Sequence, residues 1–396
     1  MRIGFAELAF GSVADCFAES LYIMTEESYV QDKDYDLMKK LRPGKIILPV
    51  LIGLAVVVWF MVKDVSLTTL KEIVFSWKSV FWLSVAFLFV GLRTFSYMAR
   101  IRIFTDNELS WIQSFRVIIL WEFTSAVTPS TVGGTAFAVI FLHKEGISTG
   151  KSTSVVLATS FLDELYFAVM LPLLLIFVGG RSIFITSLHG TGMGLLNNLV
   201  LVSVIGYIVV ITWVLLVGYG LFFNPEAIRK LIIRIFGLPL LKRWKASAIQ
   251  AGDDLVKSSE DLRKKTRSFW WKANIYTFLT WTARYFVMNA ILTAFFAIND
   301  HIVLFARQLV LWIMMIISPT PGGSGFAELI LGRYISDLIP VDDAHVKGVA
   351  MAMALIWRMV TYYPFLIVGA MIIPGWINKK FIKHSKEKPN AVDQSF

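Results

Sequence analysis

Seven charged side chains lie inside long apolar stretches of this sequence. A charge deep in a bilayer is costly and usually faces the interior of a helical bundle rather than lipid. An arginine guanidinium binds phosphate through two parallel hydrogen bonds, and carboxylates beside it tune its charge or carry a proton. These side chains therefore predict a site for an anionic head group. They are Arg93, Glu122, Asp163, Glu164, Arg284, Glu328 and Arg358.

Two interpretations of these charges remain open. In the first, Arg284 and Arg358, each about a dozen residues into its apolar stretch, bind the head group together. In the second, Asp163 or Glu164 neutralises one of these arginines, and the pair only holds the bundle together. Arg93 lies two turns from the end of its stretch, so its long side chain can also reach the membrane surface.

Proline and glycine interrupt two further apolar stretches near their centres. The first break ends in Gly133-Gly134, and the second contains Gly322-Gly323. Proline removes a backbone donor and glycine is a poor helix former, so each stretch predicts two half-helices around an unwound centre. Half-helices that begin at these glycines point free N–H groups into the bundle, where they favour an anion. Glu328 lies in the first turns of such a half-helix, where it can also serve as a dipole partner or cap.

The composition is that of an integral membrane protein. Hydrophobic residues make up 56% of the 396 positions and charged residues 17%, whereas soluble proteins carry about 25% charged residues. A helix needs roughly 20 residues to cross the hydrocarbon core. Six unbroken stretches are within the range of a span: Ile46–Val62, Val80–Ala99, Thr153–Val178, Asn198–Phe223, Lys272–Ala297 and Val346–Pro374.

Loop charges indicate how the two broken stretches, Phe115–Leu142 and Val303–Arg333, enter the membrane. Cytoplasmic loops are enriched in Lys and Arg. The loop 224–271 carries eleven Lys and Arg against five acids, and it lies in the cytoplasm only if Phe115–Leu142 enters and leaves on one side. The same comparison of loop charges predicts that Val303–Arg333 also enters and leaves the membrane on one side. The predicted fold is an all-α integral membrane protein with about six full spans and two re-entrant broken-helix hairpins.

The two halves of the chain match each other. Arg93 and Arg284 are 191 residues apart, and the two Gly-Gly pairs are 189 apart. An odd number of full crossings separates the matching units, about 80–178 and 272–374, so they have opposite orientations. This pattern predicts an inverted repeat, the arrangement in which secondary transporters bind substrate near the midplane with discontinuous helices.

The remaining segments are assigned by charge and length. Residues 1–37 contain an apolar run that is too short to span, so we expect a poorly ordered N-terminal extension before the polytopic membrane domain at 38–380. The basic tail at 381–396 is expected in the cytoplasm. We therefore predict a multi-pass protein of the inner (cytoplasmic) membrane with both ends of the mature chain on the cytoplasmic side.

Other chemistries find little support in the residue pattern. The five histidines show no metal-ligand spacing, and the single cysteine, Cys16, excludes an internal disulfide. Asp163-Glu164 is the one feature that favours an enzyme acting on a lipid head group. The net charge of +10 comes from loop residues and does not require a nucleic acid. We expect no metal, no cofactor and no catalytic activity.

The breaks also carry a family resemblance. Pro129 with Gly133-Gly134, and the run Pro319-Thr-Pro-Gly-Gly-Ser-Gly-Phe-Ala-Glu328, resemble the membrane domain of lysylphosphatidylglycerol synthases, which defines a wider flippase-like family. The resemblance covers about residues 40–380, and Arg358 matches the family's arginine in the last repeat. Members of the family commonly carry Glu-Arg where this chain has Asp163-Glu164. Because the chain ends about twenty residues after the last predicted span, we expect no soluble aminoacyl-transfer domain of the kind that the synthases carry.

The resemblance implies a flippase that moves an anionic lipid or a polyprenyl-linked lipid between leaflets. Arginines and half-helix N-termini would bind the head group in a midplane cavity. The alternative is a non-transporting membrane scaffold for a lipid-modifying or glycosyl-transferring enzyme, with the basic loop 224–271 as its docking surface. That loop is equally consistent with a helix that lies on the membrane and is attracted to anionic head groups.

Overall fold

A computed structural model describes residues 75–127, 133–184, 199–237, 245–315, 326–377 and 379–380. Every extended regular element in these ranges is a helix, as expected for a membrane protein of this class. The predicted extension 1–37, the predicted first span Ile46–Val62 and the predicted tail 381–396 lie outside the described residues. The longer helices are α5 (Trp77–Phe104), α6 (Trp111–Val127), α7 (Gly133–Lys144), α8 (Thr149–Val178), α10 (Leu199–Phe222), α11 (Pro225–Ile235), α12 (Lys245–Arg263), α13 (Arg267–Phe295), α14 (His301–Met315), α15 (Phe326–Ile335), α16 (Asp343–Thr361) and α17 (Tyr363–Ile377). Two short elements, α9 (Gly180–Ile183) and the 3-10 helix η3 (Ser336–Leu338), complete the set.

Four stretches of helix in the described ranges are long and apolar enough to cross a membrane: Trp77–Phe104, Thr149–Val178, Val200–Phe222 and His345–Ile377. Each covers a predicted span, and the last consists of α16 and α17 joined at Tyr362. Helix α13 covers the fifth predicted span and has 29 residues. It is not among the four, and its more apolar C-terminal part carries the polar side chains of Arg284 and Asn289. The all-helical membrane class is confirmed, and the count of six spans stays a prediction.

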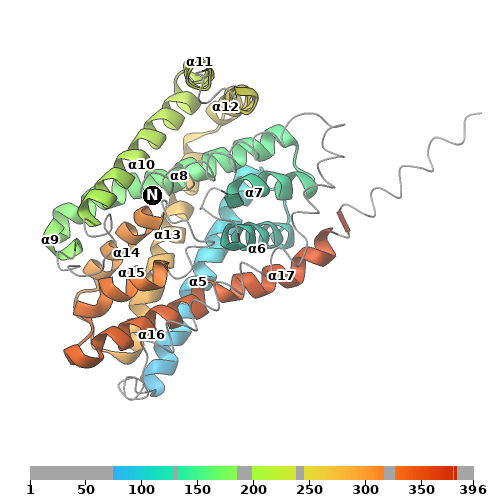
Figure 1. The fold of residues 1–396 in the computed structure, drawn as a ribbon. Coiled ribbons are helices and arrows are strands. Elements are labelled where there is room, and N and C mark those ends of the chain that lie inside the picture. The colour runs from blue at the N-terminus through green and yellow to red at the C-terminus, as the bar shows by residue number, and fades with distance from the viewer. Residues whose placement is uncertain are drawn as a thin grey trace, which may run out of the picture.

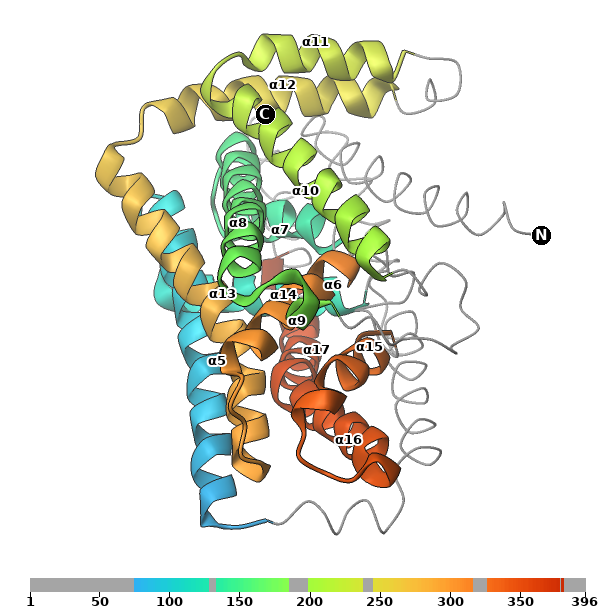
Figure 2. The same ribbon diagram turned by 90° about the vertical axis from the view of Figure 1, so that its left-hand side faces the viewer.

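Helices α5 and α13 form a long antiparallel pair, which runs side by side in both views (Figures 1 and 2). At one end, Ser79 Oγ donates to the Ala294 carbonyl oxygen at 2.9 Å. At the other end, the ring of Phe104 packs edge-on against Phe269, with centroids 4.9 Å apart. These contacts bring the middle of α5, which carries Arg93, level with the middle of α13.

Two further pairs form helical hairpins. Helices α6 and α7 pack together, and Arg116 near the start of α6 forms an ion pair at 2.7 Å with Glu145, just after α7. In the pair α14 and α15, Arg307 of α14 forms an ion pair at 2.5 Å with Asp337, just after α15. Each hairpin is therefore held at its open end by an arginine and a carboxylate. The residues that connect the helices of each pair, 128–132 and 316–325, lie outside the described residues.

The two hairpins open toward opposite ends of the bundle. Lys151 at the start of α8 and Lys265 just before α13 both form ion pairs with Asp106, at 2.8 and 2.6 Å, so the end of α5 lies beside these starts. Glu145 lies on this end too, only a few residues before α8. At the other end, Arg307 Nε donates to the carbonyl oxygen of Ser182, after α8, at 2.9 Å. We call the end with Asp106 and Glu145 the basic end, because α11 and α12, from the Lys- and Arg-rich loop 224–271, lie there. We call the end with Arg307 and Ser182 the opposite end.

Helices α11 and α12 cross the basic end instead of running along the bundle. They are seen almost end-on in Figure 1 and lengthwise in Figure 2, where they lie across the top of the molecule. The packing there is close. A Cβ on Gly220 of α10 would lie 2.8 Å from Leu255 of α12, and one on Gly252 of α12 would lie 2.7 Å from Arg229 of α11. Glycine at both positions lets the three helices approach one another.

Candidate functional site

Arg358 and Glu328 form a buried ion pair. Arg358 lies near the end of α16 and Glu328 in the first turn of α15, and Nε and Oε1 are 2.8 Å apart. The guanidinium also lies over the rings of Trp357 and Tyr362, 5.1 and 4.8 Å from their centroids. The partner of Arg358 is thus Glu328 of the second hairpin rather than Asp163 or Glu164. This follows from the packing of α15 against α16.

The inner ends of both hairpins meet at the junction of α16 and α17. The hydroxyl of Tyr362, at the junction, donates to the Ala126 carbonyl oxygen near the tip of the first hairpin at 3.0 Å. One turn earlier, Arg358 holds Glu328 near the tip of the second. Helix α7 begins at Gly133, and a Cβ on Gly134 would lie 1.8 Å from Ser125 Oγ, so glycine allows α6 and α7 to approach closely. Gly322 and Gly323 lie outside the described residues.

A second cluster lies near the middle of the antiparallel pair α5 and α13. Arg93 is 3% exposed and forms an ion pair with Glu122 of α6, so it is held inside the bundle rather than reaching the membrane surface. Its guanidinium also packs on the ring of Phe365 at 5.0 Å from the centroid. Arg284 lies on α13, the helix paired with α5, and forms no ion pair with Glu122, so within the described residues this carboxylate compensates Arg93.

Arg284 differs from the other arginines of the bundle. Its guanidinium lies 5.3 Å from the ring centroids of both Trp281 and Trp312. Within the ranges that the structure describes, it makes no hydrogen bond or ion pair of its own. Aromatic faces stabilise a cation but do not neutralise it. Of the predicted arginines, Arg284 is the one that keeps an uncompensated charge.

Asp163 is bound by an arginine that sequence reasoning missed. Arg100 places two guanidinium nitrogens on the two oxygens of Asp163, at 2.5 and 3.0 Å, and Trp281 Nε1 donates to the same carboxylate at 2.7 Å. The predicted span ended at Ala99, one residue before Arg100, whereas α5 continues to Phe104. Arg100 follows Arg93 by seven residues, which places both on one face of a helix and is the signal that could have revealed it.

Glu164 is not part of that pair. Its Oε2 atom is buried, and within the described part of the chain it has no hydrogen-bond partner. The adjacent position, Asp163, carries all the contacts with Arg100 and Trp281. The two acids of the Asp-Glu pair therefore have different environments, one with an arginine and one without.

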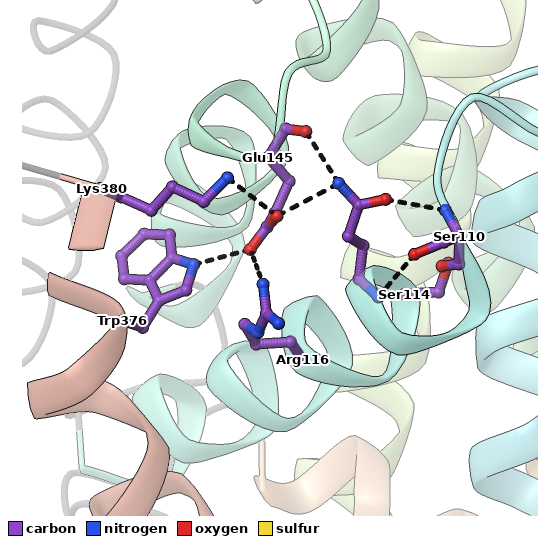
Figure 3. Close-up of polar contacts among 7 residues, drawn as sticks. Ser110, Ser114, Arg116, Glu145, Trp376 and Lys380 are labelled. Carbon is purple, nitrogen blue, oxygen red and sulfur yellow. Dashed lines mark hydrogen bonds and ion pairs between the residues drawn. The ribbon is translucent and has the colours of Figure 1, made fainter. Parts of the chain in front are cut away.

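Glu145 is the centre of a third cluster, shown in Figure 3, that sequence reasoning also missed. Its side chain is 1% exposed and accepts from Arg116 at 2.7 Å, from Trp376 Nε1 at 2.8 Å and from Lys380 at 3.1 Å. Gln113 Nε2 adds a contact at 3.3 Å. Burial by itself would raise the pKa of Glu145, but the hydrogen bonds from Arg116, Trp376 and Lys380 outweigh burial and lower it. The cluster ties the first hairpin to the end of α17.

The ion pairs at the open ends of the hairpins occupy matching positions. Arg116 and Arg307 are 191 residues apart, the same separation as Arg93 and Arg284, and Glu145 and Asp337 are 192 apart. Arg307 also donates to the Tyr334 carbonyl oxygen at 2.6 Å, near the end of α15. The separation observed for Arg93 and Arg284 could have located Arg307 in the sequence.

Comparison with known proteins adds the family. The profile of the lysylphosphatidylglycerol synthase transmembrane (TM) region matches residues 46–369. The chain belongs to this family. A curated relative is a UPF0104 membrane protein from Archaeoglobus fulgidus, 24% identical over 284 residues, which cover 70% of this chain and 80% of the relative. No solved structure matches the chain.

The match to the synthase transmembrane family covers the candidate site apart from Trp376 and Lys380 of the third cluster. It includes both hairpins, the pair α5 and α13, and the junction of α16 and α17. The predicted resemblance to this family is therefore confirmed. In the described ranges, no three His, Cys, Asp or Glu side chains gather in a way that could hold a metal ion.

Proposed function

We propose that this protein moves an anionic lipid or a polyprenyl-linked lipid between leaflets of the cytoplasmic membrane. Membership of the synthase transmembrane family supports a lipid-related role in the membrane. The head group would bind inside the bundle, with Arg284 as its first contact and Arg93 beside it.

The observation that carries this proposal is the charge balance around Arg284. Glu122 is paired with Arg93, and Arg284 makes no hydrogen bond or ion pair in the described residues. An uncompensated charge inside a membrane protein is costly and usually marks a functional position. A phosphate head group would neutralise it and accept the fork of donors that a guanidinium presents.

The arrangement of the hairpins supports transport rather than static binding. We interpret α6–α7 and α14–α15 as re-entrant hairpins of an inverted repeat, which enter from opposite sides. Their open ends carry matching ion pairs, and their inner ends contact the same junction at Tyr362. In transporters of this kind, one repeat moves against the other around a site near the midplane. The start of α7 at Gly133-Gly134, and the half-helix start that the sequence predicts at Gly322-Gly323, would add N–H donors to that site.

The paired residues take a second role in this proposal. Arg358 would reach a head group only by releasing Glu328, and Asp163 holds Arg100 in place. A head group that enters between α15 and α16 would then compete with Glu328 for Arg358. The Oε2 atom of Glu164 is buried without a hydrogen bond in the described residues. In this proposal Glu164 would either stay protonated and neutral, or release and rebind a proton during the cycle.

The test compares two arginines in purified protein reconstituted into liposomes that contain fluorescent phosphatidylglycerol. Arg284→Gln should weaken lipid binding by roughly one to two orders of magnitude, because a charge-assisted contact contributes about 1.5–3 kcal/mol. Arg284→Lys should recover part of it, since an ammonium keeps the charge and loses the fork. Arg333→Gln is the matched control, because Arg333 also lacks an ion pair in the described part of α15. Equal effects at Arg284 and Arg333 would contradict the proposed site.

The same liposomes address the alternative of a scaffold. Movement of the labelled head group to the other leaflet, measured by its reduction with dithionite, supports transport. If wild-type protein moves no labelled phosphatidylglycerol or polyprenyl phosphate, the scaffold interpretation gains support. A change in the total mass of the lipid would instead reveal catalysis.

A further inference from the structure

Helix α11 presents a basic pair beside an apolar pair on its exposed side. Lys230 and Arg234 are one turn apart, as are Leu231 and Ile235, so each pair lies on one face of the helix. All four side chains are exposed. Lys230 and Arg234 have no acidic partner among the described residues, whereas the neighbouring Arg229 is bound to Asp253 of α12 at 2.5 Å. The exposed side of α11 is thus amphipathic and positively charged.

The level of α11 relative to the membrane follows from its connection to α10. The spanning helix α10 ends at Phe222, and α11 begins three residues later at Pro225. Near its end, α10 exposes the rings of Tyr219 and Phe223, which stack 5.9 Å apart. Exposed aromatic rings at the end of a span mark the boundary between hydrocarbon and water. Helix α11 runs across the bundle from this point (Figure 2), so it starts at the level that these rings mark.

Helix α12 shows the opposite pattern. Its exposed side chains include Lys257, Glu260 and Asp261, a mixture of both signs. Its buried side chains, such as Leu255, pack on α10 and α11. Helix α12 therefore has a surface suited to water, and the apolar and basic surface is confined to α11.

We propose that α11 lies on the membrane at the basic end and binds anionic lipid head groups through Lys230 and Arg234, with Leu231 and Ile235 inserted between the lipids. An amphipathic helix with basic residues flanking its apolar face binds at the interface in this way, and anionic lipid strengthens the contact. The chemistry favours lipid over a protein partner, because basic residues without an acidic partner in the described residues border an exposed apolar pair, and α11 begins three residues after a helix that is long and apolar enough to span. The inference does not depend on transport.

The experiment places an environment-sensitive fluorophore on a single cysteine, Ile235→Cys, in a protein that also carries Cys16→Ser. The protein is reconstituted into vesicles of phosphatidylcholine alone or with added phosphatidylglycerol. We expect a blue-shifted emission and stronger quenching by a lipid-attached quencher when phosphatidylglycerol is present. A fluorophore at Glu260→Cys on α12 should stay in water in both vesicles.

Charge reversal separates the contribution of the basic pair. Lys230→Glu with Arg234→Glu should abolish the effect of phosphatidylglycerol on the Ile235 fluorophore, whereas Lys257→Glu on α12 should leave it unchanged. Rising salt should weaken the effect in the labelled protein without charge reversal, which tests the charge dependence even if the double variant fails to fold. A fluorophore that stays in water in both vesicles overturns the proposal and leaves the face for a protein partner. Equal quenching in both vesicles, or an effect that resists charge reversal and salt, overturns it as well.

Discussion

The guanidinium of Arg100 donates from two nitrogens to the two carboxylate oxygens of Asp163, at 2.5 and 3.0 Å, and so joins α5 to α8 inside the bundle. Thr277 of α13 accepts a third hydrogen bond from Arg100 at 2.9 Å, so one side chain connects three helices. Arg100 is 2% exposed, which means that its charge depends on Asp163 for compensation.

Removing Asp163 should therefore destabilise the protein. Breaking a buried pair costs about 3–5 kcal/mol, because the remaining charge stays buried without a partner. Asp163→Asn should lower the midpoint of thermal unfolding in detergent, and Arg100→Gln together with Asp163→Asn should restore most of it. If the fall in the thermal midpoint of the double variant equals the sum of the falls in the two single variants, Arg100 and Asp163 do not act as a pair.

The pair of Arg358 and Glu328 tests whether an arginine can serve both structure and binding. Glu328→Gln should lower thermal stability, because Arg358 is buried and loses its carboxylate. Arg358→Gln with Glu328→Gln should restore stability but leave phosphatidylglycerol binding weak. Recovery of both stability and binding in the double variant would exclude a head-group contact for Arg358.

Glu145 predicts a pH dependence of stability. Its pKa is lowered in the folded protein, so it stabilises the fold above the pKa of an unfolded glutamate, about 4.3. This contribution is lost as the pH falls through the lower pKa of the folded state. We expect the thermal midpoint of the wild type to fall more steeply below about pH 4.3 than that of Glu145→Gln. Glu108→Gln, at a carboxylate that is 51% exposed, serves as the control and should keep the wild-type slope.

The orientation of the bundle can be measured with single cysteines in a Cys16→Ser background. Ser148 precedes α8 at the basic end, Asp342 precedes α16 at the opposite end, and both are exposed. An impermeant thiol reagent should label Ser148→Cys only after the cells are opened and Asp342→Cys in intact cells whose outer layers admit the reagent. Labelling of Ser148→Cys in intact cells would contradict the six-span topology.

The sequence by itself determined the class of the protein and the approximate positions of its long apolar helices. In hydrocarbon, backbone groups must be satisfied within each segment, so stretches such as Thr153–Val178 have little choice but to be helical. The break at Gly133-Gly134 could also be predicted from the local sequence, because proline and glycine weaken a helix wherever they occur. Helix α7 indeed begins at Gly133. The family, too, was recognisable from motifs that are contiguous in the chain.

Only the tertiary structure decided which charges are paired. Asp163 and Glu164 are neighbours in the chain, yet one binds Arg100 and the other does not, because successive side chains on a helix point about 100° apart. Which carboxylate meets which arginine depends on the packing of helices that are far apart in sequence. The packing of α15 on α16 brings Glu328 to Arg358, and the packing of α6 on α5 brings Glu122 to Arg93 rather than to Arg284. No local pattern encodes these distances.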